Sequence, residues 1–350
     1  MPRKLLIALY KAQKFVALSA AKLPAPLLGA MGRALDPNLA NADSHMRVLM
    51  GASRASGHKL ITPNVKKSRK NYEAICIGSR DATIEMHEVE TLTLDHPEVK
   101  RGLKMRRYVP NKPSGTDAML VFFHGGGFVL GSLETHDEFC RLFARESGMQ
   151  VLALDYRLAP EHVAPAAILD CELCLSFAFK SAARFGVSIE RIAVGGDSAG
   201  GNLAAVITQQ TRGSEIQSCA QLLIYPTADT VRPYPSHDRW GTGYTLSYED
   251  MAVFVSVSMG KNNALDLTDP LIAPIRGDLK KLPPALVVIA EIDVLSDEGV
   301  AYAQKLESAG VKTQTQQCFG LPHGFIHMIG LHEGSKQACI KMAKTFAKMV

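Results

Sequence analysis

The segment 191–202, RIAVGGDSAGGN, constrains the fold of this chain more than any other. A short apolar run ends at Ser198, which has two glycines on each side of it within three residues. Glycines permit a turn too sharp for side chains, and such a turn leaves the serine hydroxyl exposed. The helical pattern GNLAAVITQQ follows, so strand, tight turn and helix come in the order typical of a nucleophile elbow. The alternative is a small-residue turn without chemistry, and the flanking strand and helix favour the nucleophile.

Apolar runs rich in branched residues alternate with helical patterns from about residue 83 onward. The runs span residues 119–123, 151–156, 191–196, 220–226 and 285–293. Strands buried on both faces and separated by helices predict a parallel sheet in an α/β fold. Residues 83–94 and 101–110 alternate only partly, which predicts antiparallel edge strands.

Two segments do not follow this alternation, residues 1–80 and residues 227–284, the second with one clear helix at 248–259. We expect them to form a second, smaller layer over the carboxyl edge of the sheet, where ligands bind in open α/β folds. The sequence therefore predicts a catalytic domain made of residues 81–226 and 285–350, with 1–80 and 227–284 as additions to it.

A serine hydroxyl needs a base that takes its proton and an acid that orients the base. Four histidines follow Ser198, and His323 comes directly after the last predicted strand, in the loop FGLPHGF. That position favours His323 over its neighbour His327, which we expect to pack in the following turn. His237 lies in the inserted segment, and His332 lies beside the last helix.

Asp293 is the acid that the pattern favours, because it ends the predicted strand ALVVIAEID. Glu291 should point to the other face of that strand. Asp297 and Glu298 have a structural explanation in the first turn of the next helix, with Ser296 as its expected N-cap.

A tetrahedral intermediate also needs donors for its oxyanion, and the N–H group of Ala199, directly after the serine, is one candidate. The others should lie after the strand 119–123, where the sequence reads HGGGF from His124 to Phe128. Three consecutive glycines leave backbone N–H groups unshielded. The alternative is a phosphate-binding loop, but the segment lacks the lysine of a P-loop and the GxGxxG spacing.

Composition excludes several classes of function for this chain of 350 residues. Its net charge of +5 is modest, and it has no run of five like charges and no basic segment interleaved with aromatics, so we expect no nucleic-acid partner. Seven scattered cysteines predict a reducing, cytoplasmic compartment. The pair Cys171 and Cys174 lies in a helical pattern without further zinc ligands, which predicts buried helix residues.

The first 26 residues combine basic and apolar positions. Lysines interrupt the apolar run and no small-residue cleavage site follows, which argues against a signal peptide. The pattern predicts an amphipathic helix that stops at Pro24 and Pro26 and has one basic face. That face carries Lys4, Lys11, Lys14 and Lys22. We favour a solvated face on a packed helix, with contact to a membrane surface as the alternative. No stretch reaches the length of a transmembrane span.

Six segments resemble one known family and cover residues 118–330 in the expected order. They are HGGGF, DYRLAPEH, GDSAGGNLAA, GYTLSYEDM, LPPALVVIAEIDVLSDEG and LPHGF. The chain resembles the hormone-sensitive-lipase-like branch of the α/β-hydrolases, also called bacterial family IV esterases. The resemblance implies an α/β-hydrolase fold, mostly parallel, with a helical cap formed by residues 1–80 and 227–284. It implies a triad of Ser198, Asp293 and His323 and an oxyanion hole of Gly126, Gly127 and Ala199.

The function implied is that of a serine carboxylic-ester hydrolase, acting on short-to-medium acyl esters through an acyl-enzyme without a metal or organic cofactor. An amidase or natural-product deacetylase with the same triad, or a non-catalytic small-molecule receptor, is the alternative. The N-terminal helix and four cap residues are expected to line the acyl pocket: Trp240, Tyr244, Met251 and Phe254. A homodimer is common in the family. Val294 and Ser296 replace the family's usual proline and arginine beside the acid, which predicts a looser acid loop or an altered pocket.

Overall fold

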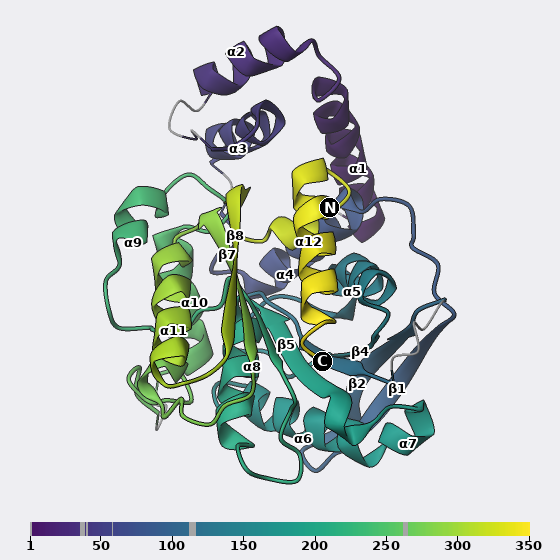
Figure 1. Cartoon of the computed structure of the whole chain (residues 1–350). Helices are drawn as coiled ribbons and strands as arrows, with labels where there is room; N and C mark the ends of the chain where they lie inside the picture. The colour runs from purple at the N-terminus through teal and green to yellow at the C-terminus, as the bar shows by residue number, and fades with distance from the viewer. Residues whose placement is uncertain (1, 36–38, 40, 58, 112–116, 262–264) are drawn as a thin grey trace.

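The computed structural model describes residues 2–35, 39, 41–57, 59–111, 117–261 and 265–350. Its centre is a sheet of eight strands in the order β1-β2-β4-β3-β5-β6-β7-β8 (Figure 1). The strands are β1 (Glu88–His96), β2 (Val99–Val109), β3 (Met119–Phe123), β4 (Gln150–Leu154), β5 (Ile192–Asp197), β6 (Gln221–Ile224), β7 (Ala285–Ile292) and β8 (Thr313–Pro322). β1 and β2 pair antiparallel, as do β2 and β4, and all other pairs are parallel. The predicted parallel sheet with antiparallel edge strands is therefore confirmed.

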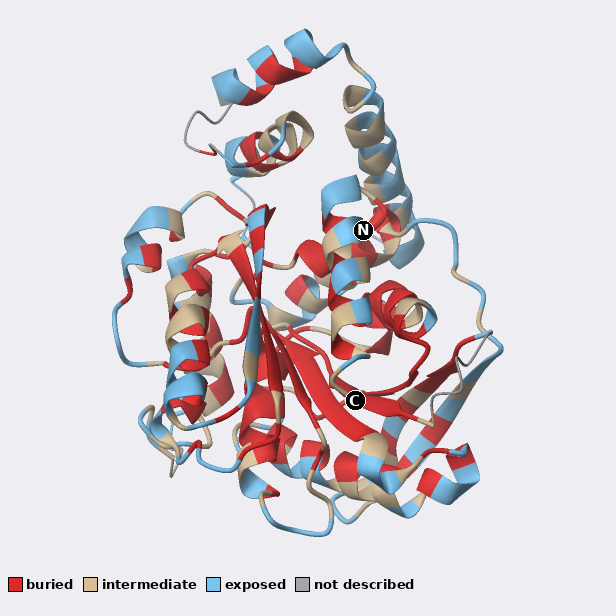
Figure 2. Cartoon of the chain, viewed as in Figure 1, coloured by how far each residue is buried: buried red, intermediate tan, exposed pale blue. Residues whose placement is uncertain are grey.

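Alternate residues of each central strand enter two separate cores. On β3, Met119, Val121 and Phe123 pack on one face, and Leu120 and Phe122 pack on the other, all fully buried. The first face is covered by α6 (Ala166–Lys180), α8 (Ala199–Gln210) and α11 (Ser296–Ser308), and the second by α5 (Leu133–Ser147) and α12 (Glu333–Phe346). Because both faces are covered, the strands are apolar throughout rather than alternating, and Figure 2 shows them buried.

The helical pattern around residues 166–186 forms two helices. α6 ends at Lys180, and the short α7 (Ala182–Phe185) follows after Ser181. Cys171 and Cys174 are fully buried in α6, as predicted, and all seven cysteines of the chain are free.

The two segments that break the alternation lie outside the sheet, as expected. The first contains α1 (Arg3–Ala20), α2 (Ala25–Leu35), α3 (Ser44–Ser56) and α4 (Val65–Ser79), and the second contains α9 (Pro235–Trp240) and α10 (Tyr248–Met259). α1 ends before Pro24, and α1 to α3 lie at one end of the molecule (Figure 1). Within the described ranges no one helix has both the length and the apolar composition of a membrane span. α1 and α2 meet that test only jointly, across a bend of 119°.

Candidate active site

Ser198 lies in the tight turn between β5 and α8, with φ +53° and ψ −117°. Few residues other than glycine adopt a positive φ, and such strain is typical of functional turns. The turn is possible because its neighbours have no side chains. A Cβ on Gly196 would lie 2.3 Å from the backbone of Gly200, and one on Gly200 would lie 1.9 Å from the carbonyl oxygen of Phe123. The glycines that frame the serine are therefore required by close backbone packing.

His323 and Asp293 lie in a hydrogen-bonded chain with Ser198. His323 Nε2 is 3.0 Å from Ser198 Oγ, and His323 Nδ1 is 2.7 Å from Asp293 Oδ2. Asp293 accepts a hydrogen bond from the Nδ1–H group, which leaves the Nε2 lone pair directed at the serine hydroxyl. All three side chains are buried. The arrangement can remove a proton from Ser198 and stabilise the imidazolium that results.

The acid loop after β7 is held at several points. Asp293 Oδ1 accepts a hydrogen bond from the Leu295 N–H at 2.8 Å. Val294 is fully buried, and its carbonyl accepts the Ser236 hydroxyl from α9 at 2.7 Å. Val294, which stands where the family usually has a proline, is thus packed and its carbonyl is hydrogen-bonded. The looser acid loop and the altered pocket stay predictions.

The loop after β3 has the backbone conformation that glycine provides. Gly126 and Gly127 have φ +117° and +61°. The N–H group of Gly125 donates to Asp197 Oδ1 at 2.7 Å. In the described part of the chain no protein acceptor binds the N–H groups of Gly126, Gly127 and Ala199. These three groups are free to donate to an oxyanion near Ser198.

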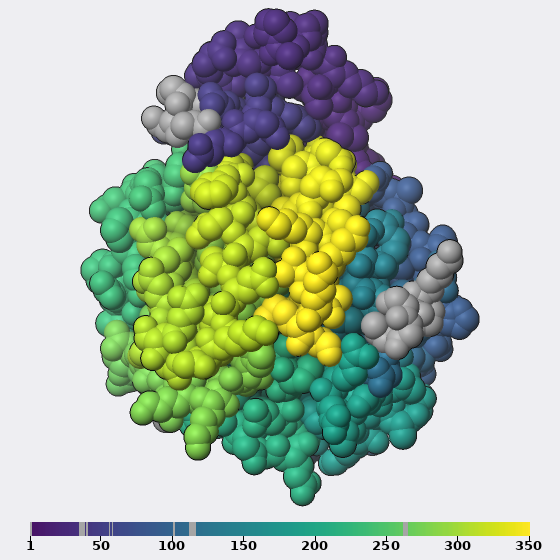
Figure 3. All heavy atoms as spheres, in the orientation of Figure 1, coloured from purple at the N-terminus to yellow at the C-terminus, as the bar shows by residue number. Residues whose placement is uncertain are grey.

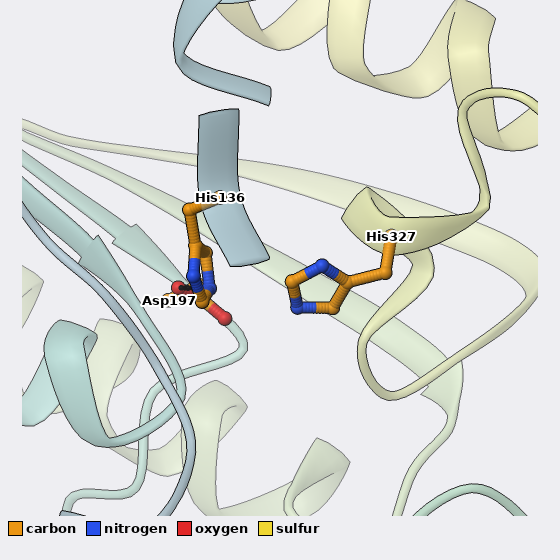
Figure 4. A group of neighbouring side chains, drawn as sticks. All are labelled: His136, Asp197 and His327. Atoms are coloured by element: carbon orange, nitrogen blue, oxygen red, sulfur yellow. Dashed lines mark ion pairs between the residues drawn. The ribbon is translucent and has the colours of Figure 1, made fainter. Parts of the chain in front are cut away.

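Buried polar side chains next to the loop after β3 form a network around Asp197. His136 Nε2 lies 3.0 Å from Asp197 Oδ1, and the His327 ring lies beside this pair (Figure 4). His327 Nε2 is also 2.9 Å from the Tyr72 hydroxyl. Burial opposes ionisation of Asp197, yet the charge and hydrogen bond offered by His136 hold its pKa at about 2. Burial lowers the pKa of His327 to about 3, so its ring is neutral at pH 7. Asp197 is therefore ionised at neutral pH and holds Gly125 through the hydrogen bond from its N–H group.

The same cluster has a composition that metal ions use. His136, Asp197 and His327 each offer one ligand atom, and these atoms lie within 4.8 Å of one another. Asp197 already accepts the Gly125 N–H, and His327 already bonds Tyr72. We interpret the cluster as a support for the loop after β3. The sequence analysis considered His327 only as the neighbour of His323, and no motif joins it to His136 and Asp197, so the cluster itself was not predicted.

A cavity of about 370 Å³ opens onto Ser198 and His323. Three of the four predicted cap residues line it, namely Tyr244, Met251 and Phe254. The Phe254 ring lies so close to the loop after β3 that a Cβ on Gly127 would be 2.3 Å from it. The prediction for Trp240 is wrong, because its ring packs edge-on against Tyr244, with centroids 5.4 Å apart, and does not line the cavity.

The N-terminal wall of the cavity comes from different helices than expected. Among the described residues α1 contributes none to the lining. Leu49 and Met50 of α3 and Tyr72 and Ile75 of α4 take that place. The lining is predominantly apolar, so the cavity suits a hydrocarbon group with a reacting carbonyl at Ser198.

Glu298 has a role that the sequence did not reveal. The expected N-cap, Ser296, is already the first helical residue of α11, and Glu298 is fully buried. Its carboxyl group accepts the N–H groups of Ala228 and Asp229, the second at 2.7 Å, and the Thr227 hydroxyl at 3.2 Å. Burial raises its pKa to about 8. Glu298 thus fixes the point where the inserted segment leaves β6.

Comparison with known proteins places these features in one family. Residues 120–327 match the family described as alpha/beta hydrolase fold. The chain is 36% identical to the carboxylic ester hydrolase LipN of Mycobacterium tuberculosis, over 87% of this chain and 80% of the relative. It is 31% identical to Lipase 2 of a Moraxella species, over 94% and 87%. The solved structure of an esterase from Pyrobaculum calidifontis is 37% identical, with a TM-score of 0.77 over 85% of this chain and 97% of the other.

Proposed function

This chain belongs to the hormone-sensitive-lipase-like esterases of the α/β-hydrolase superfamily and is a serine ester hydrolase of the EC 3.1.1 type, and on that premise we propose which residues carry its reaction. Ser198 is the nucleophile, His323 the general base and Asp293 the residue that orients it. The observation that carries this assignment is the hydrogen-bonded chain from Asp293 through His323 to Ser198 Oγ.

In the first stage Ser198 Oγ attacks the ester carbonyl carbon while its proton passes to His323 Nε2. Asp293 stabilises the imidazolium that forms. The carbonyl oxygen becomes an oxyanion, which accepts hydrogen bonds from the N–H groups of Gly126, Gly127 and Ala199. The intermediate collapses as the bond to the alcohol oxygen breaks, and that oxygen takes the proton from His323. An acyl group then remains on Ser198.

In the second stage water replaces the alcohol. His323 takes a proton from the water, whose oxygen attacks the acyl carbon, and the same three N–H groups receive the second oxyanion. Collapse releases the carboxylic acid, and His323 returns its proton to Ser198 Oγ. Every proton transfer uses Nε2 of His323. The hydrogen bond from Nδ1 to Asp293 keeps the ring in the tautomer that this requires.

The substrates we propose are esters with short-to-medium acyl chains. The cavity of about 370 Å³ lies at the small end of ligand pockets, and its lining is predominantly apolar. Phe254 beside the loop after β3 and Leu49 and Met50 of α3 limit the space for a longer chain. We propose that residues 1–80 and 227–284 act as the cap that forms this lining, around the catalytic residues 81–226 and 285–350.

The alternatives have less support. The relatives compared above are named for ester hydrolysis, which favours esters over amides. A receptor that only binds its ligand has no use for a base 3.0 Å from the serine hydroxyl. We also propose a cytoplasmic location, which the seven free cysteines support. The homodimer that the family resemblance suggests stays untested. For the N-terminal helix, the solvated basic face stays the prediction from the sequence, with membrane contact as its alternative.

The proposal is tested with p-nitrophenyl esters from acetate to palmitate. We expect turnover to peak at short or medium chains and to fall at least about 1000-fold in Ser198→Ala and His323→Ala, because each removes a member of the triad. Ser308→Ala and His87→Ala, matched changes at exposed positions outside the cavity, should keep wild-type rates. Wild-type turnover in Ser198→Ala would refute the assignment. Faster cleavage of the matching anilides than of the esters would favour the amidase.

A further inference from the structure

The outward side of α1 is apolar, although this helix is not covered there. Leu5, Leu9, Phe15 and Val16 are 56%, 46%, 72% and 66% exposed. At 100° per residue these four side chains fall within an arc of about 120°. α1 packs against α4 through its other side, where Leu6 is buried and Tyr10 contacts Gly78. A surface helix usually has one apolar side, which packs against the core. α1 differs because a second apolar side faces outward.

α2 extends this outward face around a bend. The chain turns by 119° between α1 and α2, and Leu27 and Met31 of α2 are exposed. α2 packs against α3 with its other side. Figure 3 shows the two helices as a projection at one end of the molecule, and Figure 2 shows much of their outer side exposed.

The charge of this projection is of one sign. Residues 1–35 contain six lysines and arginines and no aspartate or glutamate, whereas the net charge of the whole chain is only +5. Arg3 pairs with Glu73 at 2.6 Å, and Lys14 lies 4.0 Å from Asp81. In the part of the chain that the structure describes, no carboxylate pairs with the other four cations, which are Lys4, Lys11, Lys22 and Arg33. The exposed apolar side chains thus lie among cations that no carboxylate of the described residues pairs with.

Three surroundings for such a face can be compared. Water leaves the apolar area unburied. A second copy of the chain, packed symmetrically through this face, brings two sets of unpaired cations together, which is unfavourable. An anionic bilayer takes the apolar side chains into its acyl boundary and pairs the cations with its headgroups. Of the three, only the bilayer both buries the apolar side chains and pairs the cations.

We propose that α1 and α2 form a lipid-docking surface that seats the protein on an anionic bilayer. The surface consists of Leu5, Leu9, Phe15, Val16, Leu27 and Met31, with Lys4, Lys11, Lys22 and Arg33 around them. α4 and α3, on which the two helices pack, both line the cavity at Ser198. Docking therefore brings the N-terminal wall of the cavity close to the membrane, so that apolar esters dissolved in the bilayer are near the site.

The test is sedimentation of the full chain with vesicles of phosphatidylcholine alone and of phosphatidylcholine with phosphatidylglycerol. We expect binding to the anionic vesicles that weakens with salt. It should fall at least about tenfold in Phe15→Ser/Val16→Ser, which removes apolar side chains from the acyl boundary, and in Lys4→Glu/Lys11→Glu, which reverses the charge that attracts anionic headgroups. Ile189→Ser, at an exposed apolar position on another part of the molecule, and Lys280→Glu/Lys281→Glu are the matched controls.

Turnover of p-nitrophenyl acetate in solution should be unchanged in every variant, which shows that each is folded and separates this proposal from the assignment of the triad. Equal binding to both kinds of vesicle would overturn the proposal, as would binding that the four substitutions on α1 do not alter. Light scattering supplies a second check. A dimer that Phe15→Ser/Val16→Ser dissociates would assign the face to a second copy of the chain instead.

Discussion

Asp197 connects the nucleophile to the loop that receives the oxyanion. It precedes Ser198 directly, and its side chain accepts the Gly125 N–H at 2.7 Å and faces His136 at 3.0 Å. Its carboxyl group is ionised at neutral pH, because His136 holds its pKa at about 2. We infer that Asp197 is a positioning residue that acts through Gly125 on the neighbouring N–H donors.

Asp197→Asn should lower kcat about tenfold or more and change KM little. The substitution removes the charge that holds the Gly125 N–H and His136, so the donors of the loop are less well placed for the transition state, while the apolar cavity still binds substrate. Steady-state kinetics on p-nitrophenyl butyrate measure both constants. Asp266→Asn, at an exposed position, is the control. A kcat equal to that of wild type would show that the carboxylate has no positioning role.

At the scale of single residues, the sequence predicted the three members of the proposed triad but not their supports. Ser198, Asp293 and His323 follow strand ends, and parallel strands place such ends together, so their meeting is predictable. His136 lies inside a helix, and nothing local distinguishes it from an ordinary helix residue. Trp240 was misplaced because the direction of a cap side chain depends on packing between helices that the sequence does not reveal.

The turn between β5 and α8 sets the position of Ser198, so the site depends on its geometry. Gly200 is close to the carbonyl of Phe123 on β3, so the first turn of α8 can approach the neighbouring strand only without a side chain. This contact links the position of Ser198 to the strand before the oxyanion loop.

Gly200→Ala should therefore destabilise the protein by several kcal/mol or prevent its folding, because the added methyl group meets backbone that cannot move aside. Thermal unfolding measures the effect. Gly29→Ala on α2 is the matched control, since its Cβ would meet nothing closer than 3.4 Å, and it should leave the midpoint nearly unchanged. Equal midpoints for the two variants would contradict the packing argument.

The contact between α11 and the start of the inserted segment predicts a pH dependence of stability. Glu298 has a folded-state pKa of about 8, against about 4.3 in an unfolded chain. Between these values the folded state holds the proton and the unfolded state does not, so the contribution of Glu298 is complete below pH 4 and is lost as the pH rises toward 8. The loss is about 1.4 kcal/mol per pH unit within that window.

Glu298→Gln keeps the shape and removes the ionisation, so its free energy of unfolding should fall less between pH 5 and pH 8 than that of wild type. Chemical denaturation at a series of pH values measures this difference. Glu307→Gln, at an exposed position of α11, should keep the wild-type slope. If Glu298→Gln also keeps the wild-type slope, the buried carboxyl is ionised at neutral pH.

At the scale of the whole molecule, the strands and α1 were predictable, whereas the other N-terminal helices were not. β3 begins and ends at the predicted residues, because strands buried on both faces are uninterrupted apolar runs. α1 was predictable from its lysines and prolines. α3 and α4 carry no motif, so their place along the cavity, instead of α1, became known only from tertiary packing. The predicted division into catalytic and cap segments is compatible with this arrangement and stays a prediction.

The central claim is that the reaction passes through a covalent acyl-enzyme on Ser198. The most direct measurement is mass spectrometry of the protein after reaction with diethyl p-nitrophenyl phosphate, which phosphorylates an activated serine and releases p-nitrophenol. We predict one diethylphosphoryl group, on the peptide that contains Ser198, with loss of esterase activity in proportion to labelling, and no label in Ser198→Ala or His323→Ala. Labelling of a different residue, or full inactivation without a label on Ser198, would contradict the account.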